Sequence, residues 1–260
     1  MVPSPGGPHP NFPMVAARLL DGLRAEPVRV HAITNAAAQV FTANLLLAVH
    51  AIPSLTVAPE EVAAFTRRAG ALLVNLGTLD ADRRAGIPEA IAAARAGAVP
   101  WVLDPVFVDA SPPRLAFARD CLAAGPAILR CNAGEFAALA DGPADTGAVA
   151  AFARRHHLVV ALTGPVDSVT DGTRLVRVAN GHPLMARVTA MGCAGTALIA
   201  AFLAREPDPL IAAAAALLVF EVAGEIAGER SAGPGSFPAA LLDALDALDL
   251  PLLQARARLT

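Results

Sequence analysis

The stretch Val188–Phe202 combines a turn, a thiol and an apolar segment. Gly192 permits a tight turn with exposed backbone amides, and the small, apolar residues Ala194–Leu203 predict a buried helix that begins beside Cys193. The first turn of a helix leaves N–H groups that bind anions, and its partial positive charge lowers the pKa of a thiol. The stretch therefore predicts an anion site with a reactive thiol. The alternative is a buried, inert cysteine at a helix start.

Polar residues also follow the ends of several predicted strands. They are Asn35, Asp104, Asn132 with Glu135, and Thr163 with Gly164. Taken singly, Asn132 is explained as a helix cap and Asp104 as an ordinary strand exit. Together they indicate a site, because ligands of parallel α/β sheets bind beyond the carboxyl ends of the strands. The carboxylates of Asp104 and Glu135 would suit Mg²⁺ bound partly through water.

The chain contains no lysine, since all 20 basic residues are arginine. This excludes a phosphate loop of the Walker type and a Schiff-base enzyme, because both need a lysine amine. Any phosphate must therefore be bound by arginine, backbone amides and metal. The histidines show no metal-ligand spacing, and His182 in Asn180–Pro183 is typical of a turn. A cysteine–histidine hydrolase is therefore disfavoured, because it needs a base beside the thiol.

Hydrophobic periodicity predicts strands that alternate with helices through the first 163 residues, and the strands are almost wholly apolar. This pattern favours a mainly parallel sheet covered on both faces. Asp171-Gly172-Thr173 predicts a hairpin turn, and three helices close the chain at Ala194–Ala204, Pro209–Ala227 and Phe237–Leu248. We expect a disordered tail over residues 1–13 and a single domain over residues 14–260.

Charge and composition narrow the class of protein. A net charge of −3 gives no reason to expect nucleic acid or an anionic membrane as partner. The apolar runs Ala194–Ala204 and Leu210–Phe220 are about 11 residues long, whereas a membrane span needs roughly 20. Three cysteines without paired spacing favour a reduced cytoplasmic setting and show no zinc pattern.

Short motifs between about Val28 and Leu248 occur in the order and spacing of one known protein family. They are I-T-N at 33–35, F-T-A-N at 41–44, L-V-N-L-G-T-L at 73–79, L-D-P-V at 103–106, R-x-N-A-x-E at 130–135, T-G-x-V-D at 163–167, N-G-H-P-L-M at 180–185, G-C at 192–193 and G-P-G-S-F at 233–237. In this order they resemble the hydroxyethylthiazole kinase family.

The resemblance implies a ribokinase-like three-layer α/β/α sandwich with a mainly parallel central sheet, and a homotrimer with sites at subunit interfaces. It implies transfer of the ATP γ-phosphate to the primary hydroxyl of 4-methyl-5-(2-hydroxyethyl)thiazole in thiamine salvage. The implied site residues are Cys193 as the catalytic residue, Asn35, Leu55 and Ala190 at the thiazole, Arg114 and Thr163 at ATP, and Asp104 and Glu135 at Mg²⁺. In addition, the amides of Ala190, Met191, Gly192 and Cys193 at the predicted helix start would form an anion hole. A base and a merely orienting group are both compatible with Cys193.

Departures from the family pattern leave the acceptor open. Ala190 stands where the family has glycine, Leu55 replaces the usual methionine, Pro165 replaces a common glutamate, and residues 107–109 replace a glycine-containing segment. Two alternatives follow. One is a related kinase for another heterocyclic alcohol, of the pyrimidine or pyridoxal type. The other is a weakly catalytic thiazole-binding paralogue.

Overall fold

The computed structural model describes residues 11–260 and contains one eight-stranded sheet in the order β2-β1-β3-β4-β5-β6-β7-β8. Strands β1 to β6 are parallel, whereas β7 and β8 run antiparallel as a hairpin. The strands span β1 Arg29–Ile33, β2 Ile52–Ser54, β3 Ala71–Asn75, β4 Trp101–Asp104, β5 Ile128–Asn132, β6 Val159–Thr163, β7 Asp167–Thr170 and β8 Leu175–Val178. The predicted parallel sheet and its D-G hairpin are thus confirmed.

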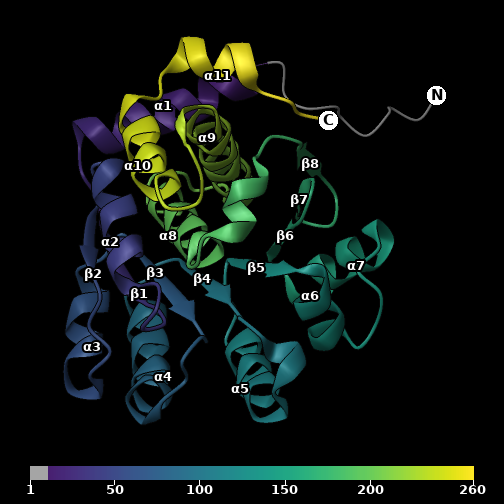
Figure 1. Cartoon of the computed structure of the whole chain (residues 1–260). Helices are drawn as coiled ribbons and strands as arrows, with labels where there is room; N and C mark the ends of the chain where they lie inside the picture. Colours follow the sequence, from purple (N-terminus) through teal and green to yellow (C-terminus); the bar gives the residue numbers. More distant parts are fainter. Residues whose placement is uncertain (1–10) are drawn as a thin grey trace.

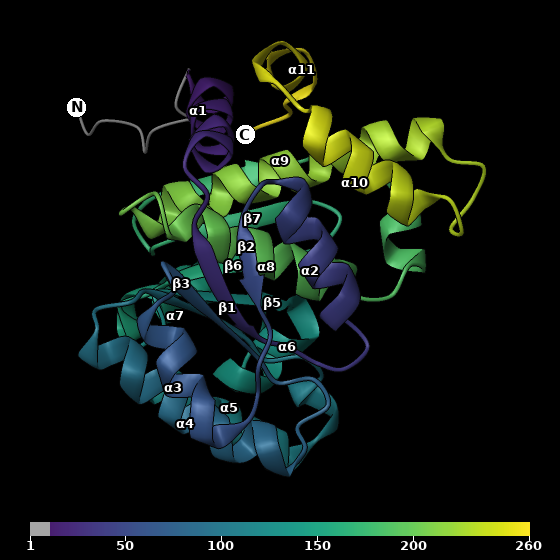
Figure 2. The same cartoon turned by 90° about the vertical axis from the view of Figure 1, so that its left-hand side faces the viewer.

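Helices cover both faces of this sheet. They span α1 Phe12–Ala25, α2 Gln39–Ala48, α3 Pro59–Arg67, α4 Ala81–Ala96, α5 Pro112–Ala123, α6 Ala133–Ala140, α7 Thr146–His156, α8 Met191–Leu203, α9 Pro209–Arg230, α10 Phe237–Ala247 and α11 Leu250–Arg256, with 3₁₀ turns η1 Val108–Ala110 and η2 Pro183–Arg187. Figures 1 and 2 show α3, α4 and α5 on one side of the sheet, and α1, α8, α9 and α10 on the other.

Alternation of side chains along the strands divides the core into two clusters, one on each face. In β3, Ala71 and Leu73 join the cluster beneath α8 and α9, whereas Leu72 and Val74 join the cluster beneath α4. Because both faces are buried, every residue of β3 is buried, and the strand has no polar face. This arrangement explains the continuous apolar strands of the sequence.

Helix α9 is the one helix of residues 11–260 that is long and apolar enough to cross a membrane. Within its most apolar window, 89% of the residues are buried inside the protein. It packs against α1, α8 and α10, and its small side chains, such as Ala212–Ala216, are buried. A helix that is apolar all round and covered by its neighbours is a core helix.

Both ends of the described chain pack against the rest of the fold. Residues 1–10 of the predicted tail lie outside the described residues, and α1 begins at Phe12, whose side chain is buried. Phe12 and Pro13, which were expected in the tail, thus belong to α1. At the other end, Thr260 exchanges backbone hydrogen bonds with Arg177 (2.9 and 3.2 Å), so the last residues line the free edge of β8.

Candidate active site

A buried hydrogen-bond chain joins the first turn of α8 to the carboxyl ends of β1, β3 and β4. Asn35 donates from Nδ2 to Cys193 Sγ (3.1 Å) and to Asn75 Oδ1 (3.1 Å). Asn75 in turn donates to Asp104 Oδ2 (2.9 Å), and Thr196 donates to the same oxygen (2.8 Å). The sheet register sets Asn75 directly beside Asp104. The strand-end residues Asn35 and Asp104 are therefore brought together with Cys193, as the sequence predicts.

The turn before α8 adopts a conformation that disfavours a side chain. Ala190 precedes the helix with φ = 71° and ψ = −4°, in the left-handed region that suits glycine. The helix begins at Met191, so Cys193 lies inside the first turn rather than before it. The amides of Ala190, Met191, Gly192 and Cys193 are at the end of the helix where anions bind.

The pKa of the Cys193 thiol is raised to about 11, so the prediction of a lowered pKa is wrong. Burial is the largest cause, and the negative charge of Asp104 adds to it. Hydrogen bonds from Asn75 and Asn35, together with the charge of Arg130, act in the opposite direction but do not offset burial. At neutral pH the group is therefore a thiol that accepts a hydrogen bond, not a thiolate.

A cavity of about 650 Å³ adjoins the start of α8. Arg130, in the middle of β5, lies so close to Gly192 that a Cβ added there would be 2.8 Å from its guanidinium. Burial lowers the pKa of Arg130, but the negative charges of Asp104 and Glu135 raise it by more than burial lowers it. The net pKa is therefore raised, and the side chain stays charged. The cavity is lined by Arg130, Thr163, Gly164, Pro165, Asp167, Ala179, Asn180, Gly181, His182, Pro183, Met185, Ala186, Met191, Gly192, Gly195, Leu217, Phe220 and Glu221.

Two carboxyl groups face the same cavity. Asp167 accepts a hydrogen bond from the Gly164 amide (2.9 Å) through Oδ1, while its buried Oδ2 has no partner among residues 11–260. Burial raises the pKa of Asp167 to about 6 and that of Glu221 to about 8, and the charge of Asp167 contributes to the second shift. Arg130 counteracts both shifts. At neutral pH Glu221 therefore keeps its proton, whereas Asp167 is mainly ionised.

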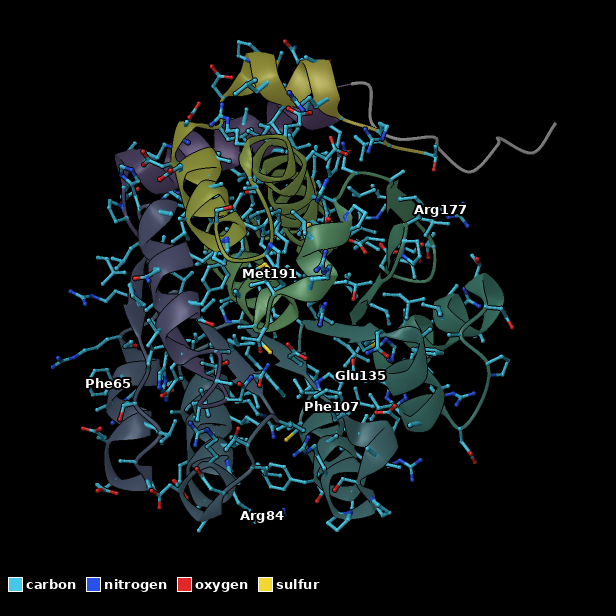
Figure 3. The ribbon with its side chains drawn as sticks, viewed as in Figure 1. Phe65, Arg84, Phe107, Glu135, Arg177 and Met191 are labelled. Atoms are coloured by element: carbon cyan, nitrogen blue, oxygen red, sulfur yellow. The ribbon has the colours of Figure 1, made fainter. Side chains whose placement is uncertain are left out.

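The two predicted metal-binding carboxylates differ in whether one of their oxygens lacks a hydrogen-bond partner. Asp104 is fully buried, and its Oδ1 has no hydrogen-bond partner within residues 11–260. Glu135 accepts from the amides of Phe107 (3.0 Å) and Asn132 (2.9 Å), which completes the predicted capping box of α6. Figure 3 shows Glu135 and Phe107 beneath Met191. Burial, with a contribution from Glu135, raises the pKa of Asp104.

These residues fit a divalent cation held mainly through water. An unpartnered carboxylate oxygen at Asp104 and a second carboxylate near enough to repel it form a pair whose charge a cation would offset. No cluster of three or more His, Cys, Asp or Glu side chains able to hold a metal occurs in residues 11–260. The Asp104–Glu135 pair would suit Mg²⁺, because this cation keeps several waters and takes few protein ligands.

Two predicted site residues lie apart from this arrangement. Arg114, on α5, donates to the Val106 carbonyl (2.8 Å) and does not line the cavity. Leu55 follows β2, half-buried against the hydrophobic core, and contributes neither to the buried hydrogen-bond chain nor to the cavity. Sequence reasoning overlooked Arg130 and Asn75 as site residues, although both lie within the motifs that carry the family resemblance and Asn75 ends β3.

The strand order and the helical layers define an α/β protein of ribokinase-like fold, with the candidate site at the strand ends. A ribokinase-like protein from Enterococcus faecalis superposes with a TM-score of 0.66 at 14% identity, over 95% of this chain and 92% of that chain. Pyridoxal kinase from Staphylococcus aureus superposes with a TM-score of 0.61 at 15% identity, over 77% and 89% of the two chains. At these identities the likeness shows the fold alone.

The family is shown by closer relatives. The sequence model of the hydroxyethylthiazole kinase family matches residues 20–250. A hydroxyethylthiazole kinase from Granulibacter bethesdensis is 49% identical over 92% of each chain, and one from Klebsiella pneumoniae is 48% identical over 90% of this chain and 95% of its own. The structure of the Pyrococcus horikoshii protein of that name superposes with a TM-score of 0.90 at 36% identity, over 95% and 98% of the chains. The chain belongs to the hydroxyethylthiazole kinase family.

Proposed function

We propose that this protein transfers the γ-phosphoryl group of ATP to the primary hydroxyl of 4-methyl-5-(2-hydroxyethyl)thiazole, giving the thiazole phosphate used in thiamine synthesis. The observation that carries the proposal is the buried hydrogen-bond chain from Cys193 to Asp104, which ends beside the Arg130 cavity. It gives one site a polar group for an alcohol, a carboxylate for a cation and an arginine for phosphate. Relatives that are 48–49% identical carry the corresponding name.

On this proposal the triphosphate lies in the cavity, against Arg130, Thr163 and the amides at the start of α8. Arg130 takes the role that the resemblance assigned to Arg114, because Arg130 lines the cavity and its guanidinium donates no side-chain hydrogen bond within residues 11–260. A fork of N–H donors and a helix N-terminus both stabilise the negative charge of a transferring phosphoryl group. The lack of lysine is thereby explained.

The acceptor alcohol lies on the side of Cys193 and Asn35. A raised thiol pKa makes Cys193 a poor general base, so we propose that its sulfur orients the hydroxyl. Phosphoryl transfer through a loose transition state needs positioning more than a strong base. Ala190 and Leu55 remain proposed thiazole contacts, Leu55 through a subunit interface.

Asp104 and Glu135 would hold Mg²⁺, which when bound neutralises charge on the phosphoryl oxygens. Asp104 offers its free Oδ1, whereas both oxygens of Glu135 already accept backbone amides, so Glu135 would act through bound water. Asn75 and Thr196 hold Asp104 in place, and backbone amides hold Glu135, before the cation binds.

We further propose a single domain over residues 14–260, a cytoplasmic homotrimer, and sites at the subunit interfaces. The edge beside β2 supports an interface, because large apolar side chains of α2, β2 and α3 are exposed there: Val40, Leu47, Ile52 and Phe65. Light scattering coupled to size-exclusion chromatography measures the assembly. A monomer at micromolar concentration would contradict it.

The test of the activity is an acceptor panel. Purified protein with Mg-ATP is given hydroxyethylthiazole, hydroxymethylpyrimidine and pyridoxal in parallel, and phosphorylated products are quantified by mass spectrometry. We expect the thiazole to have the highest kcat/KM. Preference for another acceptor would establish the shifted-acceptor alternative. Tight thiazole binding by calorimetry without turnover would establish the binding paralogue.

A further inference from the structure

Asn75 is buried at the end of β3, and its neighbours fix which way its amide faces. Its Oδ1 accepts from the Gly77 backbone amide (3.1 Å), which can only donate. Its Nδ2 therefore faces Asp104 Oδ2 (2.9 Å), where a donor is needed. A flipped amide would set Nδ2 against the Gly77 N–H and oxygen against a carboxylate, so the orientation follows from partners with fixed roles.

This orientation passes to Asn35. Because Asn75 presents an oxygen, Asn35 must present its amide nitrogen, whose second N–H then reaches Cys193 Sγ (3.1 Å). The Asn35 oxygen accepts from the Ala38 amide (3.0 Å), which agrees with the same orientation. The sulfur is thus an acceptor because of a backbone N–H two side chains away.

Gly77 supports the same arrangement sterically. A Cβ added to Gly77 would be 2.7 Å from the Asn35 Cβ and 3.0 Å from its Nδ2, closer than real Cβ contacts. The glycine therefore serves both as donor to Asn75 and as the surface on which Asn35 packs. Asn75 and Gly77 therefore restrain the Asn35 amide together, Asn75 by a hydrogen bond and Gly77 by close packing.

We propose that Asn75 is a positioning residue. It fixes Asn35 and Cys193, which lie on the acceptor side of the site, relative to Asp104, which lies on the phosphoryl side. This role in catalysis rests on the proposed kinase function, but the experiment that tests it needs no kinase activity. Asn75 is not among the proposed substrate contacts, so its effect on the reaction passes through Asn35, Cys193 and Asp104. Loss of its amide frees Asn35 to rotate, which removes a hydrogen-bond donor from the sulfur.

The three cysteines of the chain provide a reporter that needs no substrate. Cys121 and Cys131 are buried, and burial raises the pKa of Cys121 to about 12 and that of Cys131 further still. Cys193 is only partly buried, so iodoacetamide at pH 8 alkylates it first. Peptide mass spectrometry identifies the modified residue.

We expect Asn75→Ala to slow alkylation of Cys193 by roughly tenfold, the change in thiolate population that one unit of pKa produces. Asn35→Ala should slow it as well, and adding Asn75→Ala to Asn35→Ala should slow it by less than the full tenfold, because part of the Asn75 effect passes through Asn35. An unchanged or faster rate in Asn75→Ala, or effects that multiply fully in the double variant, would overturn the proposal.

Thr66→Val is the matched control for a general loss of stability. Thr66 is a buried residue of α3 whose hydroxyl bonds to His31 Nδ1 (2.8 Å) and to the Val62 carbonyl (2.9 Å), away from the cavity. Its removal should leave the alkylation rate unchanged. If Thr66→Val slows alkylation as much as Asn75→Ala does, the effect is structural and the proposal is wrong.

A second variant covers the case in which Asn75→Ala does not fold. Gly77→Ala keeps Asn75 but displaces Asn35, so it too should slow alkylation, whereas Gly142→Ala, with no atom closer than 4.0 Å, should not. Equal rates for these two variants would refute the proposal. Where the wild type phosphorylates the thiazole, Asn75→Ala should lower kcat by about 100-fold with little change in KM for ATP. A wild type without turnover would refute the proposed function while the alkylation result stands.

Discussion

Replacing Ala190 by glycine tests whether the turn before α8 stores strain. The residue has φ = 71°, where an L-residue costs about 1–2 kcal/mol relative to a right-handed conformation. Glycine removes this cost but increases the entropy of the unfolded chain by about 0.5–1 kcal/mol. We therefore expect Ala190→Gly to raise the free energy of unfolding by about 0.5–1 kcal/mol. In a chain of this length, that is a rise in melting temperature of about 2 °C.

Two alanine-to-glycine controls give this test its sign. Ala98 is exposed and also left-handed, with φ = 51°, so Ala98→Gly should stabilise by a similar amount without affecting activity. Ala151 is exposed within α7, where glycine should destabilise by about 1 kcal/mol. Urea unfolding of all three variants measures the differences. If Ala190→Gly destabilises like Ala151→Gly, the strain argument is refuted.

Replacing Arg130 by lysine keeps the charge but loses the fork of N–H donors, so KM for ATP should rise at least tenfold in steady-state assays. A larger rise in Arg114→Lys would instead identify Arg114 as the arginine that binds ATP. The pKa of Glu221 is raised from 4.5 to about 8, so the folded protein holds a proton that the unfolded chain loses. The free energy of unfolding should therefore fall as pH rises from about 5 to 8, and urea titrations of Glu221→Gln should show a flatter profile. EDTA should abolish phosphoryl transfer, and Asp104→Asn should raise the Mg²⁺ concentration for half-maximal rate more than tenfold; an unchanged Mg²⁺ requirement would remove Asp104 from the metal site.

The fold could be predicted because its signals are local. Short apolar runs between helical patterns, such as Ala71–Leu76, predict strands buried on both faces, and the D-G turn predicts the β7–β8 hairpin. Helix boundaries were less accurate. The helix expected over Ala194–Ala204 begins three residues earlier, at Met191, and ends at Leu203. Cys193 therefore belongs to the helix rather than to the turn before it.

The site could be predicted only in part, because its chemistry depends on contacts between distant segments. Strand ends predicted that Asn35 and Asp104 would lie together, since parallel strands share one edge, and both belong to one hydrogen-bond chain. The pKa of Cys193 could not be read from its place at a helix start, because burial and Asp104 outweigh the local effect. Arg114 and Arg130 are alike as letters, and only the position of β5 beside α8 distinguishes them.

The backbone hydrogen bonds of the C-terminal residues with β8 also bear on how the sheet meets other chains. With Ala179 and Arg177 paired to Arg258 and Thr260, the β8 edge has little free backbone to offer a neighbour. The β2 edge pairs only with β1 among residues 11–260 and is three residues long. Growth of the sheet by strand addition is therefore one-directional, which protects the protein against open-ended aggregation. A purification tag appended to Thr260 would emerge at the closed edge, away from β2.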